Sequence, residues 1–117
     1  MAIESQYTLA AVYIVKNEEK NLAVSLPSIM GITDEIIVFD SGSSDGTESL
    51  CNKFKVSYYK NEDWQGFGIQ RQRAQALATS DWILMLDADE EIQYNSGLIL
   101  ASLSHSWSIS FNQKSLL

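Results

Sequence analysis

The 117-residue chain is sized for a single domain with one hydrophobic core. Its hydrophobic residues (45%) and charged residues (20%) are typical of a globular protein rather than a disordered or fibrous one. A net charge of -7 argues against a nucleic-acid-binding surface, which needs clustered Lys and Arg. It leaves open a phosphate-bearing ligand whose charge is balanced by a divalent metal.

The single cysteine, Cys51, cannot form an internal disulfide, which favours a reducing compartment. The N-terminus carries Glu4 and lacks the apolar run of a signal peptide. No stretch approaches the roughly 18 to 20 apolar residues of a membrane span. We therefore expect a cytoplasmic protein, and loose association with the inner face of a membrane stays open.

The first predicted element is a strand over Leu9–Val15, because a continuous apolar run is typical of a strand buried on both faces. A helix follows. Asn17 is the expected N-cap, with Glu18 and Glu19 in the first turn, where negative charge is favourable. Pro27 falls inside the helical pattern, so we expect a kink or a break there.

The second unit repeats the first. Residues 36–39 predict a short buried strand that ends at Asp40, and residues 41–46 are rich in turn-forming Ser, Gly and Asp. A helix is expected from Thr47 to about Phe54. Residues 56–59 then predict a third strand.

A polar loop at residues 64–68 leads into a third helix that reaches about Ala78. A fourth strand, Trp82–Leu86, runs directly into Asp87 and Asp89. Four alternations of strand and helix predict an α/β fold with a doubly wound, mostly parallel sheet.

Ligands of such sheets bind beyond the carboxyl ends of the strands. The residues that directly follow strands should therefore meet at one edge: Asn17, Asp40, Asp87 and Asp89. The domain is expected to cover residues 1–92. Residues 93–117, rich in Ser and with a weak helical stripe of Leu98, Leu100 and Leu103, form an atypical segment outside the repeating pattern, and poor order is one expectation for it.

Asp87 and Asp89 are the strongest chemical signal. Two carboxylates held at the end of a buried strand can present oxygens to a ribose and to a divalent cation, and hard oxygen ligands suit Mn²⁺ or Mg²⁺ on a pyrophosphate. The alternative is a solvent-exposed acidic junction between strand and loop. The buried strand that precedes the pair favours the functional interpretation.

Asp40 is the second signal, because a carboxylate can accept a hydrogen bond from the imide N–H of a uracil base. The alternative is an Asx-type turn that caps the next helix through Ser44 or Asp45, and both can hold at once. Arg71 and Arg73 can pair with phosphate or lie on a solvated helix face. Trp64 can cover a ligand or anchor its own loop.

Together, residues 15–19, 35–47 and 81–90 resemble family-2 glycosyltransferases, which have the GT-A fold with its Rossmann-like nucleotide-binding half. The loop over residues 64–71 is similar, more narrowly, to bacterial enzymes that add glucose to the lipopolysaccharide inner core. The resemblance runs from about Thr8 to Ile92. It implies transfer of a sugar, with glucose expected, from a UDP-sugar to a saccharide or glycolipid acceptor such as lipopolysaccharide core.

The resemblance also implies a role for each matching residue. Asn17 and Glu18 would line the nucleotide pocket, Asp40 would contact the base, and Arg71 would support the nucleotide. Asp87 would meet the ribose and, with Asp89, the metal. Gln72 departs from the asparagine that commonly follows that arginine, which weakens the match locally.

Members of the family continue beyond the acidic motif with an acceptor-binding segment and a carboxylate general base, and residues 96–117 do not resemble that segment. We therefore expect a truncated, donor-binding portion whose catalytic base is missing. Two alternatives stay open: a catalytically inactive nucleotide-binding module, and a receiver-type signalling domain. A receiver would need an aspartate at the third strand, where this sequence has Tyr58, Tyr59 and Lys60.

Overall fold

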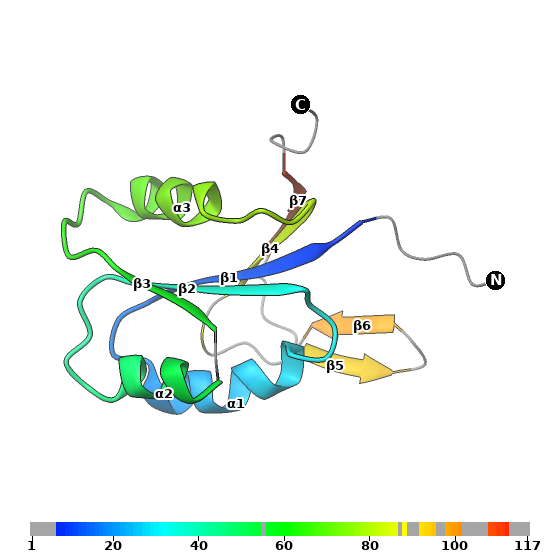
Figure 1. Cartoon of the computed structure of the whole chain (residues 1–117), viewed down its shortest axis with the longest axis horizontal. Helices are drawn as coiled ribbons and strands as arrows, with labels where there is room; N and C mark the ends of the chain where they lie inside the picture. The colour runs from blue at the N-terminus through cyan, green and yellow to red at the C-terminus, as the bar shows by residue number, and fades with distance from the viewer. Residues whose placement is uncertain are drawn as a thin grey trace.

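The computed structural model describes residues 7–54, 56–86, 88, 92–95, 98–101 and 108–112. Figure 1 shows three layers: α1 (Glu19–Ile29) and α2 (Thr47–Phe54) cover one face of the main sheet, and α3 (Phe67–Ala76) covers the other. The strands of that sheet are β1 (Leu9–Val15), β2 (Glu35–Asp40), β3 (Ser57–Lys60), β4 (Trp82–Leu86) and β7 (Ser108–Phe111). A separate two-stranded antiparallel sheet consists of β5 (Ile92–Asn95) and β6 (Leu98–Ala101).

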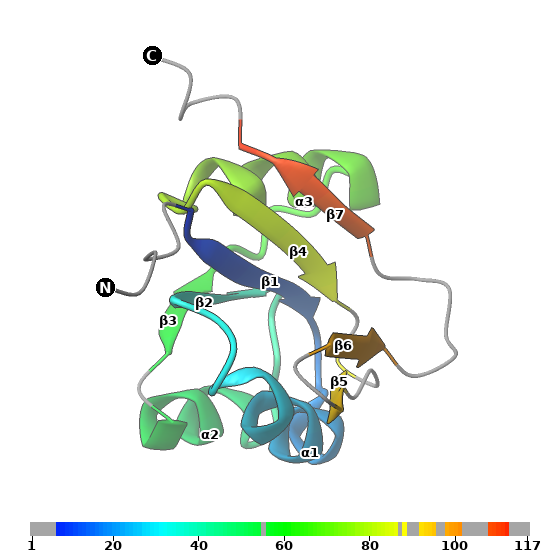
Figure 2. The ribbon, with the colours of Figure 1, turned by 90° about the vertical axis from the view of Figure 1, so that its right-hand side faces the viewer.

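The strand order of the main sheet is β3-β2-β1-β4-β7, which Figure 2 shows along the sheet. The first four strands are parallel, and β7 pairs antiparallel with β4. The chain winds outward from β1 to β3 and then returns to place β4 on the other side of β1. The predicted doubly wound, mostly parallel α/β fold is confirmed, and its switch point lies between β1 and β4.

The sheet order also excludes the receiver-type alternative. In that fold the third strand is central and lies beside the first. Here β3 pairs with β2, and Lys60 ends it at the edge of the sheet.

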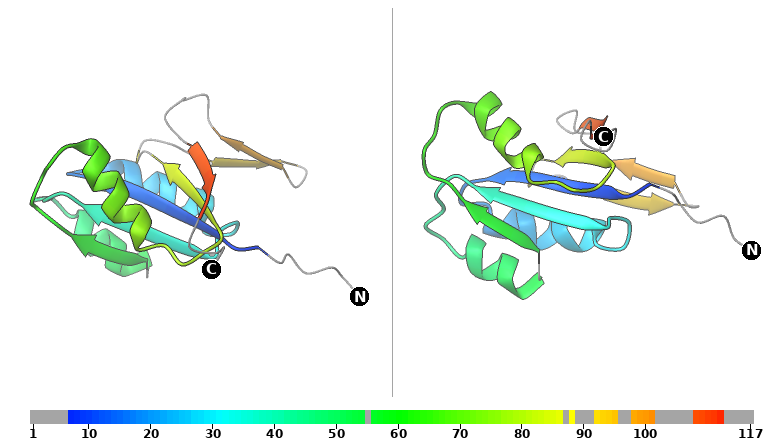
Figure 3. Two further views of the ribbon diagram at one scale, coloured as in Figure 1. Left: turned by 90° about the horizontal axis from the view of Figure 1, so that it is seen from above. Right: turned by 45° about the horizontal axis from the view of Figure 1, so that its top comes forward.

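Two apolar cores lie on the two faces of the sheet. Figure 3 shows the helices that cover these faces from two further directions. Along β1, Ala11, Tyr13 and Val15 pack toward α1 and α2, whereas Ala10 and Val12 pack toward α3. All five are at most 2% exposed. Because both faces are covered, the strand is apolar without alternation. The hydroxyl of Tyr13 is satisfied by Ser25 Oγ of α1 at 2.6 Å.

Helix α1 differs from the prediction at both ends. It begins at Glu19, and its N-cap is Glu18, which makes no side-chain capping bond, so the expected capping role of Asn17 is wrong. The helix continues through Pro27 to Ile29, so a break at the proline is wrong too. Pro27 lies in the last turn, where its missing N–H removes a single bond from a helix that ends two residues later.

The segment after residue 92 contributes β7 to the main sheet, whereas the division of the chain at that residue stays a prediction. The helical pattern expected at Leu98 and Leu100 is wrong, because Leu98–Ala101 is a strand paired with β5. A short apolar run is compatible with a helix or a strand, and the sequence alone does not show its pairing partner. Leu103 lies outside the described residues. Within the described ranges, no helix has the length and apolar character needed to cross a membrane.

Asn112, directly after β7, fastens this strand to the sheet. The residue is 4% exposed, and its Nδ2 donates to the carbonyl of Ala78 at 3.2 Å and to that of Ser80 at 2.9 Å. Its backbone N–H donates to the Asp81 carbonyl at 2.6 Å.

We predict that Asn112→Ala lowers the free energy of unfolding by about 1 to 3 kcal/mol, because two buried carbonyls lose their donor. Urea denaturation followed by circular dichroism measures this. Ser110→Ala, at an exposed position of the same strand, is the control and should have little effect. Equal stability of the two variants would contradict the docking of β7.

Candidate functional site

The carboxyl ends of β1, β2 and β3 are in register at one edge of the sheet, at the left of Figure 1. Val15 pairs with Asp40, and Asp40 pairs with Lys60. The first residue after β2 and the first residue after β3 are each bonded to the end of the neighbouring strand. Ser41 N–H donates to the Val15 carbonyl at 2.9 Å, and Asn61 N–H donates to the Asp40 carbonyl at 2.8 Å.

A pocket of about 400 Å³ opens at this edge. It is lined by Ile14, Val15, Lys16, Ser41, Trp64 and Phe67. The lining comes from the end of β1, the end of β2 and the loop that enters α3, which is where a doubly wound sheet binds its ligands. Trp64 and Phe67 are each 53% exposed, so their rings are available to a ligand.

Two other hollows lie away from this edge. One of about 260 Å³ is lined by residues that include Glu35, Ile36 and Ser57, at the amino ends of β2 and β3. Another of about 380 Å³ lies by Leu9, Trp82 and Ile109. Neither includes a residue that directly follows a parallel strand.

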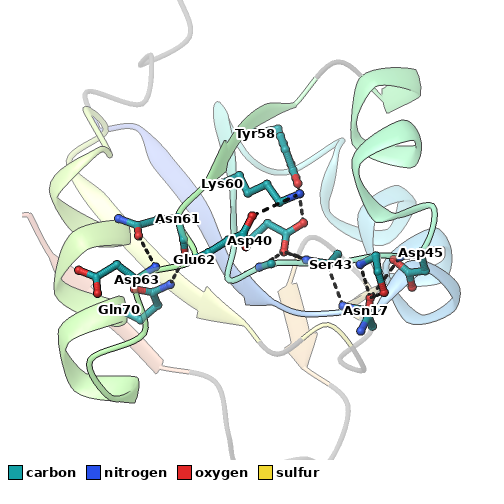
Figure 4. Close-up of polar contacts among 12 residues, drawn as sticks. Asn17, Asp40, Ser43, Asp45, Tyr58, Lys60, Asn61, Glu62, Asp63 and Gln70 are labelled. Atoms are coloured by element: carbon teal, nitrogen blue, oxygen red, sulfur yellow. Dashed lines mark hydrogen bonds and ion pairs between the residues drawn. The ribbon is translucent and has the colours of Figure 1, made fainter.

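Asp40 is fully buried, and its carboxylate organises the loop that follows β2. Oδ1 accepts bonds at 2.8 Å from Gly42 N–H, from Ser43 N–H and from the Ser43 hydroxyl. Oδ2 accepts a bond from the hydroxyl of Tyr58 on β3 (Figure 4). The carboxylate thus points into the protein, and its expected contact with a base stays a prediction.

Asn17 lies on the other side of the same loop (Figure 4). Its Oδ1 accepts from Ser44 N–H at 2.7 Å and from Asp45 N–H at 3.2 Å, and its own N–H donates to the Ser43 hydroxyl at 2.7 Å. The backbone of Asn17 has φ 56°, a left-handed conformation that Asn tolerates better than most residues. Asn17 therefore belongs to the site's edge as a support of loop 41–46.

Glu18 and Glu19 join α1 to the start of α2. Glu18 N–H donates to Thr47 Oγ1 at 3.2 Å, and Glu19 Oε1 accepts from Gly46 N–H at 3.0 Å. A Cβ on Gly46 would lie 2.6 Å from Glu19 Oε2, so glycine allows this close approach.

The expected Asx-type turn is confirmed at Asp45 rather than Ser44. Asp45 Oδ1 accepts from the hydroxyl of Thr47 at 2.6 Å and from its N–H at 3.0 Å. These bonds, led by the one from the Thr47 hydroxyl, lower the pKa of Asp45.

Burial raises the pKa of the Cys51 thiol on α2 to about 11, and the nearby charges of Asp40 and Glu48 add to this.

The two arginines of α3 occupy different environments. Arg73 binds Asp63 through its carbonyl at 2.7 Å and its Oδ2 at 3.3 Å, and also donates to Gln70 Oε1 at 2.9 Å. Arg71 is half-buried and lies four residues after Phe67, hence on the helix face that carries this pocket residue. Its role toward a nucleotide stays a prediction.

Asp87 and Asp89 lie outside the described residues, so their expected roles stay predictions. Ala88 is 2% exposed and packs in the core on the side of α1 and α2. Leu86, the last residue of β4, pairs with Tyr13 of β1. Among the residues that the structure describes, no group of three or more His, Cys, Asp or Glu side chains is arranged to hold a metal.

Sequence reasoning missed four residues of this edge: Lys16, Ser41, Phe67 and Gln70. Lys16 follows β1 directly and Ser41 follows β2 directly, so the argument from strand ends would have found them. Gln70 is fully buried on α3 and lies four residues before Ala74 on the inward face. A polar residue at such a position was the available signal.

Tyr58 gives a test of the buried contact with Asp40. Burial, with the hydrogen bond to Asp40, raises the pKa of Tyr58 above its ordinary value of 10. As the pH rises above 10, the unfolded chain loses the phenol proton of Tyr58 while the folded protein keeps it. The stability that this contact contributes is therefore complete below pH 10 and is lost progressively as the pH rises above it.

We predict that the free energy of unfolding falls between pH 9 and pH 11, and that Tyr58→Phe makes this fall shallower. Urea denaturation at the two pH values measures the slope. Tyr59→Phe, at a side chain that is 40% exposed, is the matched control and should keep the wild-type slope. The same slope in all three proteins would show that Tyr58 titrates normally.

Comparison with known proteins gives the family of the chain. The sequence model of Glycosyl transferase family 2 matches residues 11–98. An uncharacterised glycosyltransferase of Rickettsia conorii is 38% identical over 84 residues, which are 72% of this chain and 29% of that protein. The lipopolysaccharide core biosynthesis glycosyltransferase LpsC of Rhizobium meliloti is 33% identical over 88 residues, covering 72% of this chain and 32% of that protein.

Solved structures agree with this assignment. Glucosyl-3-phosphoglycerate synthase from Mycobacterium tuberculosis, in complex with Mn²⁺, UDP and glucosyl-3-phosphoglycerate, has a TM-score of 0.60 and 27% identity over 73% of this chain and 34% of its own. TarS of S. aureus has a TM-score of 0.65 at 24% identity, covering 74% of this chain and 28% of its own, and shows the likeness of fold alone. The chain spans less than a third of the length of the two curated relatives named above. The expected resemblance is confirmed, and the chain belongs to glycosyl transferase family 2.

Proposed function

We propose that the chain is the donor-binding portion of a glycosyltransferase and holds a UDP-sugar in the pocket beyond β1 and β2. The observation that carries this proposal is the position of the pocket at the carboxyl edge, with two aromatic rings and one lysine in its lining. Glucose is the proposed sugar, and a saccharide or glycolipid such as lipopolysaccharide core is the proposed acceptor. The proposed location is the cytoplasm, where a glycolipid acceptor would bring the protein to the inner face of a membrane.

The aromatic part of the pocket suits the base. Trp64 and Phe67 offer exposed ring faces to a planar uracil, and the Ser41 hydroxyl lies in the same lining. Asp40 Oδ2 accepts a bond from Tyr58, and a carboxylate oxygen can accept a second one, here from the imide N–H of the base. Because Asp40 is fully buried, that contact requires loop 41–46 to move outward.

The diphosphate would lie toward Lys16 and the acidic motif. Lys16 lines the pocket, and its ammonium can pair with a phosphate oxygen. Asp87 and Asp89 are the proposed holders of Mn²⁺ or Mg²⁺, with Asp87 also meeting the ribose, and carboxylates are the donors that these cations prefer. When bound, the metal supplies charge neutralisation for the departing diphosphate.

Three further residues complete the proposed donor site. Asn17 and Glu18 support the loop beside the nucleotide, and Arg71 of α3 adds a guanidinium on the face that carries Phe67. The relatives support the same ligand class: the M. tuberculosis synthase was solved with UDP and with Mn²⁺ or Mg²⁺, and LpsC acts in lipopolysaccharide core biosynthesis.

Calorimetric titration of UDP with and without Mn²⁺ tests the proposal. We predict metal-dependent binding to the chain and loss of the Mn²⁺ effect in Asp89→Ala, because one of the two carboxylates for the cation is gone. A folded chain that binds no UDP would contradict the proposed function. Incubation with UDP-glucose and an acceptor saccharide then separates an active enzyme, which releases UDP, from a module that binds without turnover.

Lys16 gives an independent prediction about the diphosphate. Lys16→Ala should weaken UDP binding about fivefold, equivalent to about 1 kcal/mol, and leave the weaker binding of uridine unchanged. Lys20→Ala, at an exposed position on α1, is the matched control and should bind UDP as the wild type does. An equal loss for UDP and uridine would place Lys16 away from the phosphates.

A further inference from the structure

Gln70 of α3 is a buried amide whose orientation is determined by its partners. Its exposed fraction is 0%. Nε2 donates to Ser41 Oγ at 3.0 Å and to the Asn61 carbonyl at 3.2 Å, and Oε1 accepts from Arg73 Nη1 at 2.9 Å. Because a carbonyl only accepts and a guanidinium only donates, the amide fits its site in one orientation.

Two of these partners lie in different loops at the pocket. Ser41 lines the pocket and begins the loop between β2 and α2. Asn61 begins the loop between β3 and α3, in which Trp64 provides another part of the lining. The amide is therefore a direct bridge between two walls of the pocket.

Arg73 extends the bridge along the second loop. While it donates to Gln70, its guanidinium also binds the carbonyl and the carboxylate of Asp63, the residue directly before Trp64. Asn61 Oδ1 accepts from Asp63 N–H at 2.9 Å and closes the turn between the two attachment points, which Figure 4 shows beside Gln70. The segment that leads to Trp64 is thus held at two points, at Asn61 by Gln70 and at Asp63 by Arg73.

Packing alone does not explain this residue. The next inward position of α3, Ala74, and Ala78 just after the helix are small, apolar and fully buried against the sheet. At the turn nearest the pocket the same face carries a polar side chain that satisfies both loops. A buried polar group that is fully bonded in this way typically specifies one arrangement of its neighbours.

We propose that Gln70 is a positioning residue for nucleotide binding. Its amide holds Ser41 and residues 61–64 at a set separation, so the pocket exists before a ligand arrives. Gln70 itself does not touch the nucleotide. This inference rests on the proposed function for its effect on affinity, whereas its effect on the two loops is independent of any ligand.

The test compares Gln70→Leu with Gln72→Leu, the same substitution at an exposed position of α3. Hydrogen–deuterium exchange of the ligand-free chain is expected to speed up about tenfold at the amides of residues 61–64 and 41–43 in Gln70→Leu alone. Affinity for UDP with Mn²⁺ is expected to fall about tenfold in the same variant, a loss in the range of one to two buried hydrogen bonds. Gln72→Leu is expected to match the wild type in both measurements.

Several outcomes would overturn the inference. Unchanged exchange in both loops would show that the amide does not hold them, even if affinity fell. A lower unfolding midpoint with wild-type affinity and exchange would show a purely structural role. If the wild-type chain binds no UDP, the proposed function fails, and the exchange measurement still decides whether Gln70 couples the loops.

Gln70→Glu serves if the leucine variant does not fold. It keeps the volume and the partner of Arg73 but turns an oxygen toward the Asn61 carbonyl in place of a donor. Faster exchange at residues 61–64 is then expected, and wild-type exchange there would overturn the inference.

Discussion

The buried carboxylate of Asp40 is the interaction on which the carboxyl edge of this sheet depends. It ends β2, receives three bonds from Gly42 and Ser43, and is tied to β3 through Tyr58. A buried charge is stable only when donors surround it, so the loop must fold back over β2 to supply them. That fold places Ser41 in the pocket lining and presents Ser43 to Asn17, which joins the end of β1 to the same loop.

The second half of the edge is organised by an amide rather than a carboxylate. Gln70 and Arg73 fasten the loop that enters α3, and this loop carries Trp64 toward the pocket. The two networks meet at Ser41, which bonds to both β1 and Gln70. Ser41 and the residues just before Trp64 are therefore held by partners that are themselves hydrogen-bonded.

Local sequence patterns predicted the parallel strands and the edge where they end, because burial on both faces leaves apolar runs that need no partner to be recognised. They failed where a residue acts over a long sequence separation. Asn17 has the composition of a helix cap, yet its acceptor is used by Ser44 and Asp45, 27 and 28 residues away. Gln70 and β7 were missed for the same reason, since their partners at Ser41 and β4 are not local. The positions of Asp87 and Asp89 stay predictions.

The state of Cys51 has a practical consequence. The chain's single thiol is fully buried on α2, and its raised pKa disfavours the thiolate at neutral pH. Maleimides and similar reagents react with the thiolate of an accessible side chain, so they are expected to label Cys51 of the native protein very slowly. A cysteine introduced at the rim of the pocket would carry a fluorophore or spin label alone, without replacement of a core residue.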